Sequence, residues 1–160
     1  MSLAQFACQT VMVDLVELSN KNLGQVRLLS AHCFPVVYRD SFFEQLLMHA
    51  EFVRLGYLAD CLVGAIACKL DDLGNLYLML LGVLVKYRRS GIASELLQWV
   101  IAKAHATPSI SQVCLHVQTS NLEGLSFYEK FGFQILHTCP DYYPQLDVAS
   151  AHYLVLRIEK

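Results

Sequence analysis

The sequence predicts one α/β domain over residues 1–160, built on a mixed, mostly antiparallel sheet. We expect about seven strands and about four helices. Three observations lead to this class. Three segments of strand length follow one another through tight connections, an amphipathic helix then leads into a further strand, and 55% of the residues are hydrophobic. That content is enough for a sizeable core.

The first half of the chain contains two helices and four strands. Residues Val11 to Leu18 alternate enough for a first strand, and Asn22 to Ala31 has helical spacing. Pro35 cannot continue that helix, and Asp40 can cap a second helix that runs to about Ala50. An antiparallel meander of three strands follows, at Phe52 to Ala59, Cys61 to Leu70 and Leu76 to Val85.

The second half begins with a helix whose apolar face recurs at helical spacing from Gly91 to Pro108. Ser111 to Gln118 is predicted as a fifth strand, parallel to the strand before the helix, as in a βαβ unit. The pattern Ser120-x-x-Glu123 predicts a capping box for a fourth helix. The last two strands are expected at Phe133 to Cys139 and Ala151 to Ile158.

Composition and charge exclude several classes of function. A net charge of −2 and the lack of a basic cluster argue against nucleic-acid binding. The longest apolar run has about half of the ~20 residues that a membrane span needs. Residues Met1 to Thr10 lack the pattern of a secretory signal, so we expect a protein of the cytosol or nucleus.

The cysteines and histidines show no spacing typical of a metal site. We therefore predict free thiols, mostly buried, in a reducing compartment, and no bound metal. The cysteines are Cys8, Cys33, Cys61, Cys68, Cys114 and Cys139.

Residues Arg88 to Ala93 form a tight turn between an apolar strand and a helix. Free N–H groups at a helix N-terminus carry partial positive charge and favour anions. Gly91 and Ala93 leave room for close approach, and Arg88 adds a full charge. The turn therefore predicts a site for a pyrophosphate.

Strand parity brings two ionisable side chains together. Tyr77, Met79 and Leu81 project to one face of their strand, and His116 shares a face with Cys114 and Gln118. If the two strands are neighbours, Tyr77 and His116 flank one cleft beside the phosphate turn. Each residue alone would be interpreted as structural, since tyrosine is common in strands. The other five histidines are interpreted as structural or solvated.

Several motifs resemble the acetyl-CoA-dependent GNAT N-acetyltransferases. The resemblance rests on the order of the elements, on the turn Arg88-x-x-Gly91-x-Ala93, and on Asn121 followed by Phe127-Tyr128-x-x-Phe131-Gly132-Phe133. It extends to Leu76-Tyr77-Leu78-Met79, Leu115-His116-Val117-Gln118, Phe34-Pro35-Val36-x-Tyr38 and Tyr142-Tyr143. It covers the chain from about Val13 onward and implies a GNAT (acyl-CoA N-acyltransferase) domain.

The resemblance implies that acetyl-CoA is the co-substrate, held through its pantetheine and pyrophosphate. The residues that match the family's cofactor site are Leu81, Gly82, Val83, Arg88, Arg89, Ser90, Gly91, Ile92, Ala93, Ser94, Asn121 and Tyr128. If the fourth and fifth strands splay apart, they leave unpaired backbone N–H and C=O groups. The amides of the pantetheine arm can hydrogen-bond to these groups as an added strand would.

The resemblance also implies that Tyr77 and His116 act as general base, through an ordered water, on the α-amine of a protein N-terminus. Such an amine has a pKa of about 7.7 to 8.0, so a modest base suffices. An initiator methionine followed by a hydrophobic residue is the implied substrate. Its implied binding residues are Phe34, Pro35, Val36, Tyr38, Met79, Tyr142 and Tyr143.

Two alternatives remain open at this point. An enzyme of the same fold could acetylate lysine side chains, whose pKa of about 10.4 asks more of the base, or other N-termini. A non-catalytic subunit that binds acetyl-CoA could instead serve a ribosome-associated acetyltransferase complex.

The resemblance further implies nascent peptides, and NatA-type catalytic and auxiliary subunits, as partners.

Overall fold

The computed structural model describes residues 11–160, and this range contains four α-helices and seven strands. The strands follow the order β1-β2-β3-β4-β5-β7-β6. The β4–β5 pair is parallel, whereas β1–β2, β2–β3, β5–β7 and β6–β7 are antiparallel. The mixed, mostly antiparallel sheet predicted from the sequence is therefore confirmed.

The chain divides into two compact units. The first extends to Cys68 and includes Leu80–Val100, and the second comprises Lys69–Met79 and Ile101–Lys160. The single domain over 1–160 stays a prediction.

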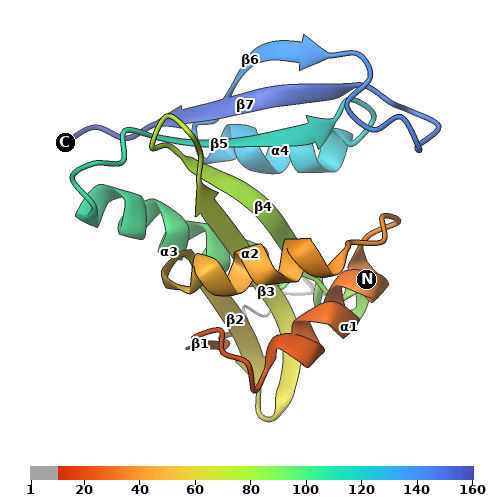
Figure 1. The fold of residues 1–160 in the computed structure, drawn as a ribbon, viewed down its shortest axis with the longest axis vertical. Helices are drawn as coiled ribbons and strands as arrows, with labels where there is room; N and C mark the ends of the chain where they lie inside the picture. The colour runs from red at the N-terminus through yellow and green to blue at the C-terminus, as the bar shows by residue number, and fades with distance from the viewer. Residues whose placement is uncertain (1–10) are drawn as a thin grey trace, which may run out of the picture. The chain divides into compact units, whose positions relative to one another are not determined.

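The first unit begins with β1 (Asp14–Val16), α1 (Leu23–Cys33) and α2 (Asp40–Met48). In Figure 1 helix α2 crosses in front of β2 (Val53–Leu58) and β3 (Cys61–Leu70). β1 is shorter than the predicted strand Val11 to Leu18. Helix α1 ends two residues later than predicted, because the Phe34 N–H still bonds to the Ser30 carbonyl before Pro35 intervenes.

One arginine of α1 contacts two residues of α2. Arg27 donates to Asp40 at 2.8 Å, and its guanidinium lies over the Phe43 ring, 4.3 Å from the centroid. Leu46 of α2 and Leu55 of β2 are fully buried in the core of this unit. The first unit thus packs its helices on its strands through aliphatic side chains.

Strand β4 (Leu76–Val83) and helix α3 (Ile92–Ala106) are each divided between the two units in sequence. The strand ends two residues before the predicted Val85, which instead opens a short 3-10 turn, Val85–Tyr87. Most of the predicted apolar face of α3 is buried, and Ile101 is half-buried. The buried members are Ile92, Leu96, Leu97, Val100 and Ala104.

The second unit continues with β5 (Gln112–Gln118), α4 (Leu122–Lys130), β6 (Gln134–Cys139) and β7 (Ala151–Arg157). Figure 1 shows β5, β7 and β6 side by side, with β7 in the middle. In this register His116 of β5 and His137 of β6 both pair with Tyr153 of β7. This register decides which side chains surround His116.

The predicted capping box at the start of α4 is wrong. The N-cap is Asn121, whose side-chain oxygen accepts from the Gly124 N–H at 2.9 Å. Asparagine is among the strongest N-cap residues. The helix therefore begins one residue later than the predicted cap at Ser120 would place it. Gly132 closes the helix with φ of 93°, a conformation that glycine adopts easily.

All five cysteines in the described range are free thiols. Cys68 and Cys114 are buried, Cys33 and Cys139 are half-buried, and Cys61 is exposed, contrary to the expectation of burial for most of them. Cys8 lies outside the described residues. Over residues 11–160, no helix is long and apolar enough to cross a membrane.

Candidate active site

The alternation predicted for β4 sets the direction of its side chains. Leu76, Leu78 and Leu80 are buried, whereas Tyr77, Met79 and Leu81 are half-buried on the other face. β4 pairs in parallel with β5 through Leu76↔Val113 and Tyr77↔Cys114. Tyr77 therefore lies near the start of the parallel pair, close to where β5 carries His116.

Tyr77 and His116 are joined by a hydrogen bond. The Tyr77 hydroxyl lies 2.7 Å from Nδ1 of His116, and the two ring centroids are 5.7 Å apart. The two side chains thus meet in the second unit, as strand parity predicted. The direction of this bond depends on which imidazole nitrogen carries the proton.

The loop between β6 and β7 brings a third ring to this pair. Tyr142 stacks on His116 with centroids 3.9 Å apart, and its hydroxyl lies 2.8 Å from that of Tyr77. Tyr143 packs edge-on against Tyr142 at 4.7 Å. The loop is fixed to its own unit, since Gln118 Nε2 donates to the Val148 carbonyl at 2.7 Å.

Burial controls the ionisation of the pair. Desolvation of the ring, with a smaller contribution from the charge of His137, lowers the pKa of His116 from 6.5 to about 4. Desolvation, followed by the hydrogen bond with Tyr142, raises the pKa of Tyr77 well above its ordinary value. At neutral pH the site therefore holds a neutral imidazole beside a neutral phenol. One ring nitrogen of the imidazole carries a proton, and the other can accept a hydrogen bond.

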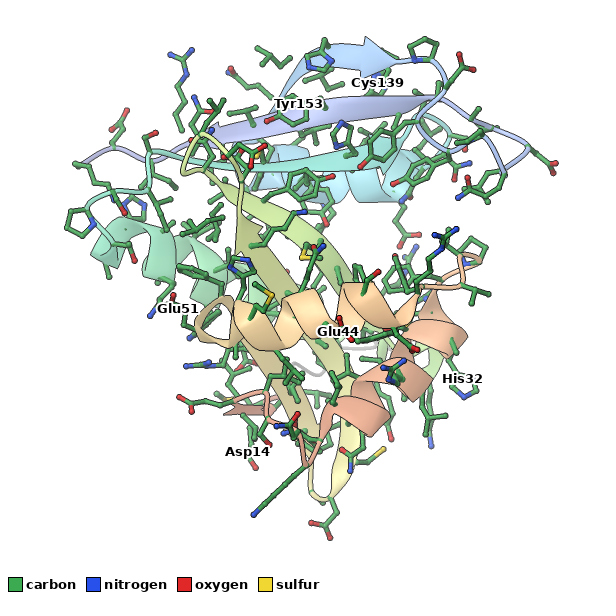
Figure 2. The ribbon with its side chains drawn as sticks, in the orientation of Figure 1. Asp14, His32, Glu44, Glu51, Cys139 and Tyr153 are labelled. Carbon is green, nitrogen blue, oxygen red and sulfur yellow. The ribbon has the colours of Figure 1, made fainter. Side chains whose placement is uncertain are left out.

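Three more side chains surround His116 that the sequence did not single out. Cys139 Sγ lies 3.8 Å from Nε2 of His116 and 3.7 Å from Nδ1 of His137. The Tyr153 ring lies 5.0 Å from His116 and 4.9 Å from His137. Figure 2 labels Cys139 and Tyr153, which lie on the paired strands β6 and β7.

His137 was interpreted as structural or solvated. It is exposed, but it belongs to this cluster. Residues 137 and 139 share a face of any strand, so parity already placed them together. What the sequence did not reveal was the register of β6 against β7, which brings that face to His116.

The predicted pyrophosphate turn lies in the first unit. Arg89 and Gly91 have φ of 60° and 88°, and α3 begins directly after them at Ile92. Arg88 and Arg89 are exposed, and Arg88 Nε donates to the Val83 carbonyl at 3.0 Å. A left-handed turn that ends at a helix N-terminus, with two exposed arginines, fits a phosphate group.

The segment after α1 contributes an aromatic wall to the same unit. Phe34 lies against Gly82, where an added Cβ would meet the ring at 3.0 Å. Tyr38 packs edge-on against Phe34 at 6.1 Å and stacks on Phe42 at 4.1 Å. Of the other two predicted wall residues, Pro35 is exposed and Val36 is half-buried.

Helix α4 of the second unit carries the remaining predicted cofactor residues. Asn121 is exposed at the N-cap. Tyr128 is buried, and its ring packs against Phe127 at 5.1 Å and Phe133 at 5.5 Å. Within residues 11–160, no group of three or more His, Cys, Asp or Glu side chains could hold a metal ion.

Comparison with known proteins gives consistent matches. Residues 20–133 match the acetyltransferase (GNAT) family. The chain is 37% identical over 145 residues to N-alpha-acetyltransferase 50 of Danio rerio, covering 89% of this chain and 86% of the relative. It is 36% identical over 145 residues to the probable N-acetyltransferase san of Drosophila melanogaster, with 89% and 79% covered.

Solved structures agree with these matches. Arabidopsis thaliana Naa50, in complex with the bisubstrate analogue CoA-Ac-MVNAL, superposes with a TM-score of 0.85 at 37% identity, over 91% of this chain and 99% of that chain. Ard1 from Thermoplasma volcanium superposes with a TM-score of 0.84 at 24% identity, over 94% of this chain and 100% of that chain. The second likeness is one of fold.

Proposed function

Because this chain belongs to the acetyltransferase (GNAT) family, we propose that it acetylates N-termini that begin with Met and a hydrophobic residue, with Tyr77 and His116 as its base. It is an acetyl-CoA-dependent N-alpha-acetyltransferase that acts on protein N-termini. The specificity and the base are the parts that we propose. The observation that carries the proposal is the 2.7 Å contact between the Tyr77 hydroxyl and Nδ1 of His116.

The low pKa of His116 determines when this base acts. Bound acetyl-CoA supplies the thioester carbonyl that the amine attacks. An imidazole with a pKa of about 4 is too weak a base to deprotonate a resting ammonium group with a pKa of about 8. It can accept a proton from a nitrogen that is already bonding to a carbonyl carbon, because that nitrogen is becoming acidic. We therefore assign His116 a role during attack.

Tyr77 connects the substrate to His116. Its raised pKa keeps it a phenol, so it does not act as a phenolate. A phenol can accept a proton at oxygen while it donates its own to Nδ1 of His116, 2.7 Å away. Either the amine or an ordered water can deliver the first proton. Tyr77 then acts as a relay, and His116 as the acceptor.

The substrate proposal rests on aromatic and apolar groups in each unit. Tyr142, Tyr143 and Met79 belong to the second unit, and the wall around Phe34 belongs to the first. Such groups suit an apolar peptide terminus. The analogue in the Arabidopsis relative carries the peptide MVNAL, which begins with Met and Val. This peptide supports the same preference in the present chain.

A peptide panel tests the proposed specificity. Purified protein should transfer acetyl from acetyl-CoA to a Met-Leu peptide much faster than to a Ser-starting peptide or to an internal lysine. Equal kcat/KM values across the panel would exclude the preference for Met and a hydrophobic residue. Rapid acetylation of lysine alone would favour a side-chain acetyltransferase of the same fold.

The cellular setting is a separate proposal. NatA-type catalytic and auxiliary subunits as partners, and residence in the cytosol or nucleus, are supported by the family resemblance alone. Affinity purification of the tagged full chain from fractionated cells, followed by mass spectrometry, tests both.

A further inference from the structure

The Nε2 side of His116 faces Cys139, and the strand register explains this contact. His116, Tyr153 and His137 are opposite one another across β5, β7 and β6, so their side chains share one face. Ala151 of β7 pairs with Cys139 on the neighbouring strand β6 and with Gln118 on the neighbouring strand β5. The small Ala151 side chain leaves room for Cys139 Sγ to reach across β7, to 3.8 Å from His116 Nε2.

These groups form one chain of hydrogen-bonding atoms. It runs from the Tyr142 hydroxyl to the Tyr77 hydroxyl, through both nitrogens of His116 to Cys139 Sγ, and ends at Nδ1 of His137. Each neutral member has one proton to donate along the chain. The donors can therefore all point toward His137 or all point toward Tyr142.

Only one of these two polarities suits the reaction. When the donors point toward His137, Nε2 of His116 donates to Cys139, and Nδ1 accepts from Tyr77. In the opposite polarity Nδ1 carries the proton, and its lone pair is no longer available to Tyr77. The partner of the second ring nitrogen thus decides whether His116 can serve as the acceptor.

We propose that Cys139 and His137 are positioning residues that hold His116 in the tautomer with the proton on Nε2, which frees Nδ1 for Tyr77. This inference rests on the role proposed above for Tyr77 and His116. Nδ1 of His137 accepts a hydrogen bond from the Cys139 thiol, so the sulfur lone pairs face Nε2–H of His116. No covalent step is involved, and no net proton moves.

Loss of the His137 ring would leave the Cys139 proton without this acceptor. The proton could then turn toward Nε2 of His116, and the tautomer would change. The other titratable groups that contact His116 are Tyr77 of β4, Tyr142 of the loop and Tyr153 of β7. Burial raises the pKa of Tyr77 and of Tyr153, so both remain phenols at neutral pH.

Nitrogen NMR of the histidine side chains tests the tautomer directly. Long-range ¹⁵N–¹H spectra of the full chain at pH 7.5 distinguish the two neutral tautomers, and the His116→Gln spectrum assigns the signal. The expected result is Nε2–H in the wild type and a mixture of tautomers in Cys139→Ala. An Nδ1–H tautomer in the wild type, or an unchanged pattern in Cys139→Ala, would overturn the proposal.

Kinetics give a second readout. Cys139→Ala and His137→Ala should each lower kcat by about 10-fold, with KM for peptide and acetyl-CoA unchanged. The double variant should be no slower than Cys139→Ala, because both residues act through one contact. Cys61→Ala and His105→Ala, at exposed positions in β3 and α3, are the matched controls and should keep wild-type turnover.

The two proposals fail in different ways. Wild-type turnover in Tyr77→Phe and His116→Gln would remove the proposed base, whatever the NMR shows. Loss of turnover in those two variants, with normal turnover in Cys139→Ala and His137→Ala, would remove only the positioning role. If Cys139→Ala does not fold, His137→Ala still decides, because His137 is exposed and its loss should change the His116 tautomer seen by NMR.

Discussion

Tyr142 lies flat on the imidazole of His116, with ring centroids 3.9 Å apart and planes inclined by 11°. Its hydroxyl also reaches Tyr77 at 2.8 Å. One side chain of the β6–β7 loop therefore contacts both members of the proposed base. This double contact predicts that the loop residue affects turnover as well as peptide binding.

Two substitutions separate the effects of Tyr142. Tyr142→Phe keeps the stacked ring and removes the hydroxyl. One hydrogen bond contributes about 1 kcal/mol, so its loss should lower kcat by about fivefold. Tyr142→Ala removes both contacts and should cost more in kcat, and it should also raise KM for the peptide. Steady-state kinetics with a Met-Leu peptide measure both. Equal losses in the two variants would mean that the hydroxyl alone matters.

Removing the proposed base should affect chemistry and leave cofactor binding nearly intact. Tyr77→Phe and His116→Ala should each lower kcat by about 100-fold, a typical loss for general-base catalysis. Titration calorimetry with acetyl-CoA should give nearly wild-type affinity. Tyr57→Phe is the matched control, since Tyr57 lies in β2 of the first unit, where its hydroxyl bonds to Gln25. A large loss of acetyl-CoA binding would reassign both residues.

The depressed pKa of His116 makes stability depend on pH. The unfolded chain protonates this ring near pH 6.5, whereas the folded chain does so near pH 4. Between these values the unfolded state binds more protons, so the free energy of unfolding should fall as pH drops from 6.5 to 4. The contribution is fully present above pH 6.5. Urea unfolding across this range should show a shallower slope for His116→Gln than for the control His105→Gln.

The sequence predicted those parts of the site that depend on alternation along one strand. Leucines mark the buried face of β4, so Tyr77 and Met79 had to lie on the other face. The βαβ order made β5 the parallel neighbour, which brought His116 to Tyr77. Family resemblance added the tyrosines of the loop. The positions of Tyr77, Met79 and His116 thus followed from local pattern and topology, and only the loop tyrosines needed the resemblance.

The parts that the sequence missed depend on pairing between distant strands. The contact of Cys139 with His116 requires β7 to lie between β5 and β6, with the small Ala151 at the crossing point. No periodicity within β6 specifies that register. The cap of α4 was misplaced for a local reason, because Ser120 and Asn121 are both good caps and the Ser-x-x-Glu pattern favoured the wrong one.

Close packing at Gly82 predicts a measurable cost for one methyl group. In Gly82→Ala the new Cβ would lie 3.0 Å from Cζ of Phe34 and 3.3 Å from Cβ of Cys33, so the ring must move. Urea unfolding should show a loss of about 1–3 kcal/mol. Gly24→Ala, in α1 with nothing within 4 Å, is the control and should leave stability unchanged or raise it by up to about 1 kcal/mol.

The corrected cap of α4 gives the sharpest comparison between neighbouring positions. Asn121→Ala removes the oxygen that accepts from the Gly124 N–H, so an exposed helix end loses its cap and unfolding should become easier by about 1 kcal/mol. Ser120→Ala should change the free energy of unfolding by less than about 0.5 kcal/mol. Asn121→Asp keeps an acceptor and should retain most of the stability. If Ser120→Ala were instead the costlier change, the capping box would be the true arrangement, because its serine would then hold the first turn.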